Sequence, residues 1–232
     1  MLCFTDSDFQ TACKELEEPQ IDGYEFFTQS HDVTIYRLYN EESGLYQYKV
    51  YGTLSDVLPD ICAQVYMDLD YRKQWDSYVK DLYETTADGN KVIYWNVAYP
   101  FPMSNRDYVY ARELREIDID GKKIWTVLAK SVDCPSIPEN RGVIRVDDYL
   151  QSCALTSDGK QGSKDWSSII PYADAGCMSG NNNNNNKNVR HKLTIISHIY
   201  LKFITFFNDI FKPGDYFLYN DRNIRMLKST ND

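Results

Sequence analysis

The chain has 232 residues and a formal net charge of −9, with 43% hydrophobic and 14% aromatic residues. This composition supports a sizeable hydrophobic core and excludes a chain that is disordered throughout. Residues 1–164 carry 17 Lys and Arg against 28 Asp and Glu, whereas residues 165–232 carry 8 against 6. The acidic part lacks the basic footprint that nucleic-acid binding requires, so no nucleic-acid partner is expected.

Tyrosine is unusually frequent, with 19 Tyr against 10 Phe and 4 Trp. Large side chains with a polar tip are typical of half-hydrated walls or amphipathic pockets.

The six Cys have no metal-ligand spacing, and the N-terminal residues lack the basic and apolar segments of a signal peptide. No apolar run of 18 residues is present to span a membrane. We therefore expect reduced thiols in the cytoplasm, with no metal and no cofactor.

The first expected element is an amphipathic helix. Thr5 and Asp8 resemble a capping box, and apolar residues follow at helical spacing: Phe9, Ala12, Cys13 and Leu16. Strand-like runs follow up to Gly52, and Pro59 begins a second helix. Residues 78–157 are nearly all strand and turn. Asp-Gly pairs at 88, 120 and 158 predict tight turns between long antiparallel strands.

Two blocks of this chain carry residues suited to binding. Arg72 and Asp76 are four residues apart, so on a helix they share a face. They form either a solvated ion pair or an Arg that Asp orients toward a phosphate or carboxylate. In the strand block 94–110, aromatic side chains including Tyr94, Trp95 and Tyr108 either pack in the core or bind a quaternary ammonium group by cation–π attraction.

A resemblance to a known family follows from three blocks in this order: MDLDYRKQWDSYVKDLYE, VIYWNVAYPFPMSNRDYVYAREL and RGVIRVDDYLQS. Over about residues 5–164, the chain resembles the START lipid-transfer domain family, and within it the phosphatidylcholine carriers. The resemblance implies an α+β helix-grip fold, in which a curved antiparallel sheet with N-terminal helices and a C-terminal lid helix enclose a lipid tunnel. It also implies an Arg that binds the lipid phosphate, paired with an Asp, and a choline cage of one Trp and two Tyr. The matching residues here are Arg72, Asp76, Trp95, Tyr108 and Tyr149.

The function implied by the resemblance is binding of phosphatidylcholine and its transfer between membranes, with transient membrane contact and no chemical conversion. The absence of catalytic motifs from the sequence also indicates a protein that is not an enzyme. The chain has none of the serine-hydrolase, zinc-protease, phosphate-loop or dinucleotide-binding motifs, and among its three His only His31 precedes residue 165.

The resemblance stops after Lys164, so the family's C-terminal strand and lid helix are expected to be missing or replaced. We divide the chain into a START-like domain at 1–164, an irregular and poly-Asn segment at 165–192, and a divergent tail at 193–232. Asn181–Asn186 predict disorder, and apolar spacing predicts a helix over 193–212. The tail is either a substitute helix that docks on the sheet or a membrane, or an alternative terminus. In the second case the protein is a lipid-incompetent isoform that interacts with protein partners.

Overall fold

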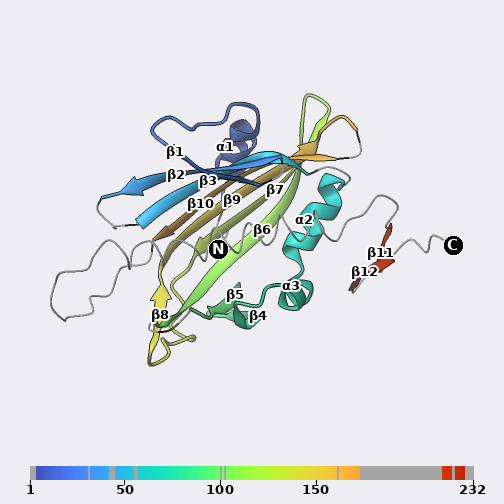
Figure 1. The fold of residues 1–232 in the computed structure, drawn as a ribbon. Coiled ribbons are helices and arrows are strands. Elements are labelled where there is room, and N and C mark those ends of the chain that lie inside the picture. Colours follow the sequence, from blue (N-terminus) through green and yellow to red (C-terminus); the bar gives the residue numbers. More distant parts are fainter. Residues whose placement is uncertain are drawn as a thin grey trace.

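A computed structural model shows the fold of the protein (Figure 1). The structure describes residues 4–30, 32–41, 45–54, 57–99, 101, 103–160, 162–172, 216–220 and 223–227. The helices are α1 (Asp6–Glu17), α2 (Pro59–Met67) and α3 (Leu69–Trp75). The main sheet consists of β1 (Glu25–Ser30), β2 (Val33–Asn40), β3 (Leu45–Leu54), β4 (Val79–Ala87), β5 (Asn90–Val97), β6 (Asn105–Ile119), β7 (Lys122–Ser131), β8 (Val143–Val146), β9 (Asp148–Ser157) and β10 (Ser163–Tyr172).

The main sheet is long, curved and almost entirely antiparallel. Its strands follow the order β1-β2-β3-β10-β9-β7-β6-β5-β4, and β8 pairs in parallel with the start of β6 (Figure 1). Two of the expected turns are confirmed. Asp88 and Gly89 have φ of 50° and 75°, and Asp120 and Gly121 have φ of 52° and 77°. Positive φ at both central residues matches the twist of the strands they join, which explains the Asp-Gly pairs.

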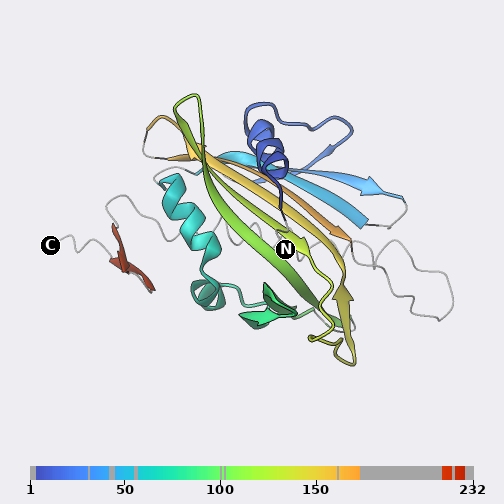
Figure 2. The same cartoon turned by 180° about the vertical axis from the view of Figure 1, so that it is seen from behind.

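Helix α1 covers one face of the sheet. The expected capping box is confirmed: the Thr5 side chain accepts from the backbone of Asp8, whose carboxylate accepts from the backbone N–H of Thr5. The helix buries its apolar side chains against β6, β7 and β9, in clusters that contain Phe9, Ala12, Cys13 and Leu16 with Ala111, Ile124, Leu128 and Ala154. We refer to this side of the sheet as the α1 face (Figure 2).

Helices α2 and α3 lie over the opposite side, which we call the α2 face (Figures 1 and 2). Pro59 stands in the first turn of α2, as expected, and the helix packs on β7, β9 and β10. Arg112 of β6 holds its last turn by donating to the carbonyls of Tyr66 (3.0 Å) and Met67 (2.8 Å). The last carbonyls of a helix need donors from outside its own ladder, so the two hydrogen bonds stabilise the corner from which α3 starts.

One sequence expectation is wrong. Residues 165–172, assigned to an irregular segment, extend β10, which pairs with β3 on one side and with β9 on the other. The missing strand is therefore present, in the middle of the sheet. Its β9 partner is the preceding strand, across the predicted turn at 158, but its β3 partner lies more than a hundred residues earlier, and the sequence after Lys164 does not reveal that pairing.

The structure describes little of the remaining tail. Residues 216–220 (β11) and 223–227 (β12) form an antiparallel pair, where the sequence showed no clear period. The predicted disorder at 181–186 and the predicted helix at 193–212 lie outside the described residues. Within the part of the chain that is described, no helix is long and apolar enough to cross a membrane, and no cluster of three or more His, Cys, Asp or Glu is placed to hold a metal.

Gly52 is expected to be irreplaceable where β3 passes β2. A Cβ at this position would lie 2.5 Å from the carbonyl oxygen of Asp32 and 2.6 Å from the Cα of Val33. Both are backbone atoms, so the strands must separate to accept it. We expect Gly52→Ala to cost about 2 kcal/mol and to lower the melting temperature by about 4–8 °C. Thr53→Ala is the neighbouring control for thermal denaturation, and an unchanged Gly52→Ala melt would contradict the close approach.

Candidate functional site

The first part of the site is an ion pair at the end of α3. Asp68 caps the start of this helix by accepting from the N–H of Tyr71 over 2.8 Å. Arg72 Nε donates to Asp76 Oδ2 over 3.2 Å, and Asp76 Oδ1 accepts from the N–H of Tyr78 over 3.1 Å. The Asp76 side chain is fully buried and that of Arg72 is 14% exposed. The pair predicted from spacing is confirmed, and its burial rules out a solvated surface ion pair.

The ion pair leaves the outer edge of the Arg72 guanidinium available. In the described part of the chain, the only hydrogen bond of its side chain is the one from Nε to Asp76. Burial lowers the pKa of Arg72, but its neighbours, led by Tyr110 and Asp76, together raise it more, so the net shift is upward and the group stays charged. A planar guanidinium with unused N–H donors matches the oxygens of a phosphate or carboxylate.

The second part of the site is a row of three buried rings, Trp95, Tyr108 and Tyr149, which we call the ring row. Trp95 of β5 lies opposite Tyr108 of β6 in the sheet, and the two rings stack with centroids 4.8 Å apart. Tyr149 of β9 meets Tyr108 edge-on at 5.4 Å. The guanidinium carbon of Arg72 lies 4.2 Å from the Trp95 ring centroid. The structure therefore brings all five candidate residues together on the α2 face.

Tyr149 reaches the other rings because β7, which lies between β6 and β9, ends at Ser131. The Ser131 hydroxyl holds the backbone of Tyr149 in place: it donates to the carbonyl over 3.2 Å and accepts from the N–H. The ring of Tyr149 then contacts Tyr108 and Tyr110, each with a centroid separation of 5.4 Å. Residues about 40 positions apart in sequence thus become one aromatic surface.

The rings carry no charge but attract cations. Burial raises the pKa of Tyr108 and of Tyr149 above the usual range, so both hydroxyls stay protonated at neutral pH. The faces of such rings are electron-rich and bind cations. Because Trp95 and Tyr108 stack directly on each other, a trimethylammonium group cannot lie between them unless a ring moves. The arrangement therefore suits a zwitterion, with the anion at Arg72 and the cation at the ring row.

Comparison with known proteins agrees with this geometry. The START domain family matches residues 22–170, which include all of the site and most of β10. The chain belongs to the START domain family. It is 53% identical over 163 residues to the phosphatidylcholine transfer protein of Rattus norvegicus and 51% identical over 163 residues to that of Homo sapiens. Each alignment covers 69% of this chain and 76% of the relative.

The fold of this START domain is also found among solved structures. The crystal structure of human STARD10 superposes with a TM-score of 0.71 at 19% sequence identity, over 90% of this chain and 82% of the other. At this identity the likeness shows the fold alone. The expected START-type sheet with its N-terminal helices is thereby confirmed. The family match ends at residue 170, within β10, and the segment after Tyr172 that would hold the expected lid helix lies outside the described residues up to 215.

Two further buried residues of the START domain's site, Gln151 and Tyr110, were not among the predicted site residues. The Tyr149 hydroxyl donates to Gln151 Oε1, and Tyr110 packs on the Tyr149 ring. Each lies two residues beyond a predicted site residue on the same strand, Gln151 after Tyr149 and Tyr110 after Tyr108. Side chains two apart on a strand share a face, so this alternation was the signal that could have found both.

Proposed function

We propose that this START domain binds phosphatidylcholine and transfers it between membranes without chemical conversion. In this proposal, Arg72, oriented by Asp76, holds the lipid phosphate, and the ring row holds the trimethylammonium group. The observation that carries it is the 4.2 Å separation between the Arg72 guanidinium carbon and the Trp95 ring. A site for an anion and a site for a cation without N–H donors adjoin there, as they do in phosphocholine. The names of the rat and human relatives support the same ligand.

A lipid-exchange experiment on the full chain tests this proposal. The protein is equilibrated with vesicles of equal phosphatidylcholine and phosphatidylethanolamine, re-isolated, and its lipid identified by mass spectrometry. We expect intact phosphatidylcholine in clear excess, with no lysophospholipid, and movement of labelled phosphatidylcholine from donor to acceptor vesicles. A folded protein that carries no lipid, or only sterol, would overturn the proposal and favour the lipid-incompetent interaction protein.

Transfer between membranes requires a membrane contact, and we infer that Phe101 provides part of it. This residue, in the β5–β6 connection, is 96% exposed. Burying an aromatic side chain in an apolar environment contributes roughly 1.5–3 kcal/mol. We expect Phe101→Ser to slow transfer by about tenfold while the bound lipid stays the same.

Phe26 provides a matched control for this substitution. It lies on β1, at the opposite end of the strand order from β4 and β5, and is 62% exposed. Phe26→Ser should leave the transfer rate close to that of the unmodified protein. Equal slowing by both substitutions would show that Phe101 has no particular role at the membrane. The cytoplasm as the place of action remains part of the proposal and is supported by the scattered cysteines.

A further inference from the structure

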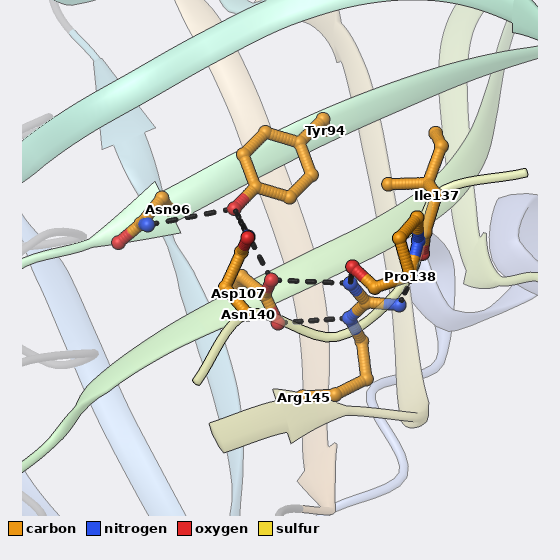
Figure 3. A network of polar contacts seen from close by, with 7 residues as sticks. All are labelled: Tyr94, Asn96, Asp107, Ile137, Pro138, Asn140 and Arg145. Carbon is orange, nitrogen blue, oxygen red and sulfur yellow. Dashed lines mark hydrogen bonds and ion pairs between the residues drawn. The ribbon is translucent and has the colours of Figure 1, made fainter. Parts of the chain in front are cut away.

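A polar cluster centred on the buried Asp107 lies on the α1 face, behind the ring row. We call it the Asp107 network; it consists of Tyr94, Asn96, Asp107, Asn140 and Arg145 (Figure 3). Asp107 Oδ1 accepts from Arg145 Nε over 2.8 Å, and Oδ2 accepts from Arg145 Nη2 over 3.1 Å. The Tyr94 hydroxyl also donates to Asp107 Oδ2 over 3.1 Å and accepts from Asn140 Nδ2 over 3.0 Å. The Asp107 side chain is 1% exposed.

The same guanidinium fixes the connection between β7 and β8. Arg145 Nη1 donates to the carbonyl of Ile137 over 3.2 Å, and Nη2 donates to that of Pro138 over 3.3 Å (Figure 3). All three nitrogens of Arg145 are therefore engaged by the protein itself. This differs from Arg72, whose described hydrogen bond uses Nε alone. The guanidinium of Arg145 thus holds the structure together and is not poised for a ligand.

The network is tied to the ring row by strand register. Asn96 pairs with Asp107 in the β5–β6 ladder, and the next pair along is Trp95 with Tyr108. On the other side of β6, Asp107 pairs with Arg145 of β8. Neighbouring residues of a strand point to opposite faces, so on β5 and β6 the polar cluster lies on one side of the sheet and the rings Trp95 and Tyr108 lie on the other.

Tyr149 depends on the same strands. It follows Arg145 by four residues, where the chain passes from β8 into β9. A shift of one residue between paired strands would move every side chain to the wrong face. The bidentate Asp107–Arg145 pair permits one register only, because its two hydrogen bonds need both side chains at fixed positions.

We propose that Asp107 and Arg145 are positioning residues for the ring row, and that they set the preference for a choline headgroup over a smaller ammonium headgroup. This inference rests on the proposed binding of phosphatidylcholine. Attraction of a cation to aromatic faces requires the rings at defined positions, whereas acyl chains need only an apolar surface. Loosening the Asp107 network should therefore reduce headgroup preference more than lipid uptake.

Competition between two lipids tests the proposal on the full chain. Asp107→Asn keeps the shape of the side chain and removes its charge, and Arg145→Lys keeps the charge and removes the fork. Each variant is equilibrated with vesicles of equal phosphatidylcholine and phosphatidylethanolamine at a temperature below its own melting point. We expect the bound ratio of the two lipids to fall about tenfold, the size of a lost cation–π contact, while total lipid stays near one per protein.

Two further variants separate positioning from general stability. Arg115 lies on β6 as well and pairs with Glu113 (2.6 Å) and Asp6 (2.7 Å), so Arg115→Lys disturbs an ion pair away from the rings and should leave the ratio unchanged. Tyr94→Phe removes the hydroxyl, and with it the hydrogen bonds to Asp107, Asn140 and Asn96, but keeps the Asp107–Arg145 ion pair. It therefore tests the network even if the charge variants do not fold. We expect the bound ratio of the two lipids to fall about threefold for Tyr94→Phe, because the network is only partly lost.

The outcomes distinguish the two proposals. If the unmodified protein shows no preference for phosphatidylcholine, the proposed function fails and this inference fails with it. If the unmodified protein prefers phosphatidylcholine and the Asp107 network variants melt earlier with an unchanged lipid ratio, only the positioning role is overturned. An equal fall in the ratio for Arg115→Lys would overturn it as well, since the effect would then reflect stability.

Discussion

Replacing Arg72 with Ala is expected to weaken phosphatidylcholine binding between about 10-fold and 150-fold. The substitution removes a charge-assisted hydrogen bond to the phosphate, which is worth about 1.5–3 kcal/mol. It should also destabilise the protein, because the fully buried Asp76 carboxylate loses its cation. Breaking a buried ion pair from one side costs about 3–5 kcal/mol. The measurements are lipid affinity by vesicle titration and thermal denaturation of the lipid-free protein.

The double variant Arg72→Ala, Asp76→Asn separates these two effects. With both charges removed, no buried carboxylate is left unpaired, so most of the lost stability should return. Binding should stay weak, since no cation remains for the phosphate. Arg72→Lys keeps a point charge without the planar fork and should bind with intermediate affinity. Normal binding by the double variant would remove Arg72 from the site.

Local sequence patterns predict the local parts of this structure. The spacing of Arg72 and Asp76 yields their ion pair, and the Asp-Gly pairs yield their turns, because each feature depends on residues within about four positions. Trp95 and Tyr108 come together through one strand pair, which follows from a turn between neighbouring strands. For Tyr149, spacing alone gave no partner, and its place in the site came from family resemblance.

The features that sequence did not reveal depend on distant contacts. Strand β10 is held between β3 and β9, and its first residue is more than a hundred positions beyond β3. Asp107 and Arg145 are 38 residues apart, and in sequence each is one of many charged residues on an acidic chain. The resemblance seen in the sequence ended at Lys164, but the family match continues to residue 170, within β10.

Trp95→Phe is expected to reduce phosphatidylcholine binding with little loss of stability. Trp binds cations more strongly than Phe does, so we expect affinity to fall about threefold to tenfold. The loss of stability is small for a specific reason. The Trp95 indole Nε1 is buried and has no hydrogen-bond partner in the described structure, so removing it relieves an unsatisfied donor. Trp95→Ala instead removes the whole ring and should cost about 3–5 kcal/mol.

Tryptophan fluorescence provides a direct readout of this site. A lipid headgroup that displaces the stacked Tyr108 or Arg72 changes the surroundings of the Trp95 indole, so titration with phosphatidylcholine vesicles should change the emission. Trp95→Phe should abolish most of that change. Trp125→Phe is the matched control, because Trp125 lies at the far end of β7 from Ser131 and should leave the change intact. A change in emission that survives Trp95→Phe and disappears with Trp125→Phe would place the headgroup away from the ring row. In that case Arg72 would bind an anion other than the lipid phosphate.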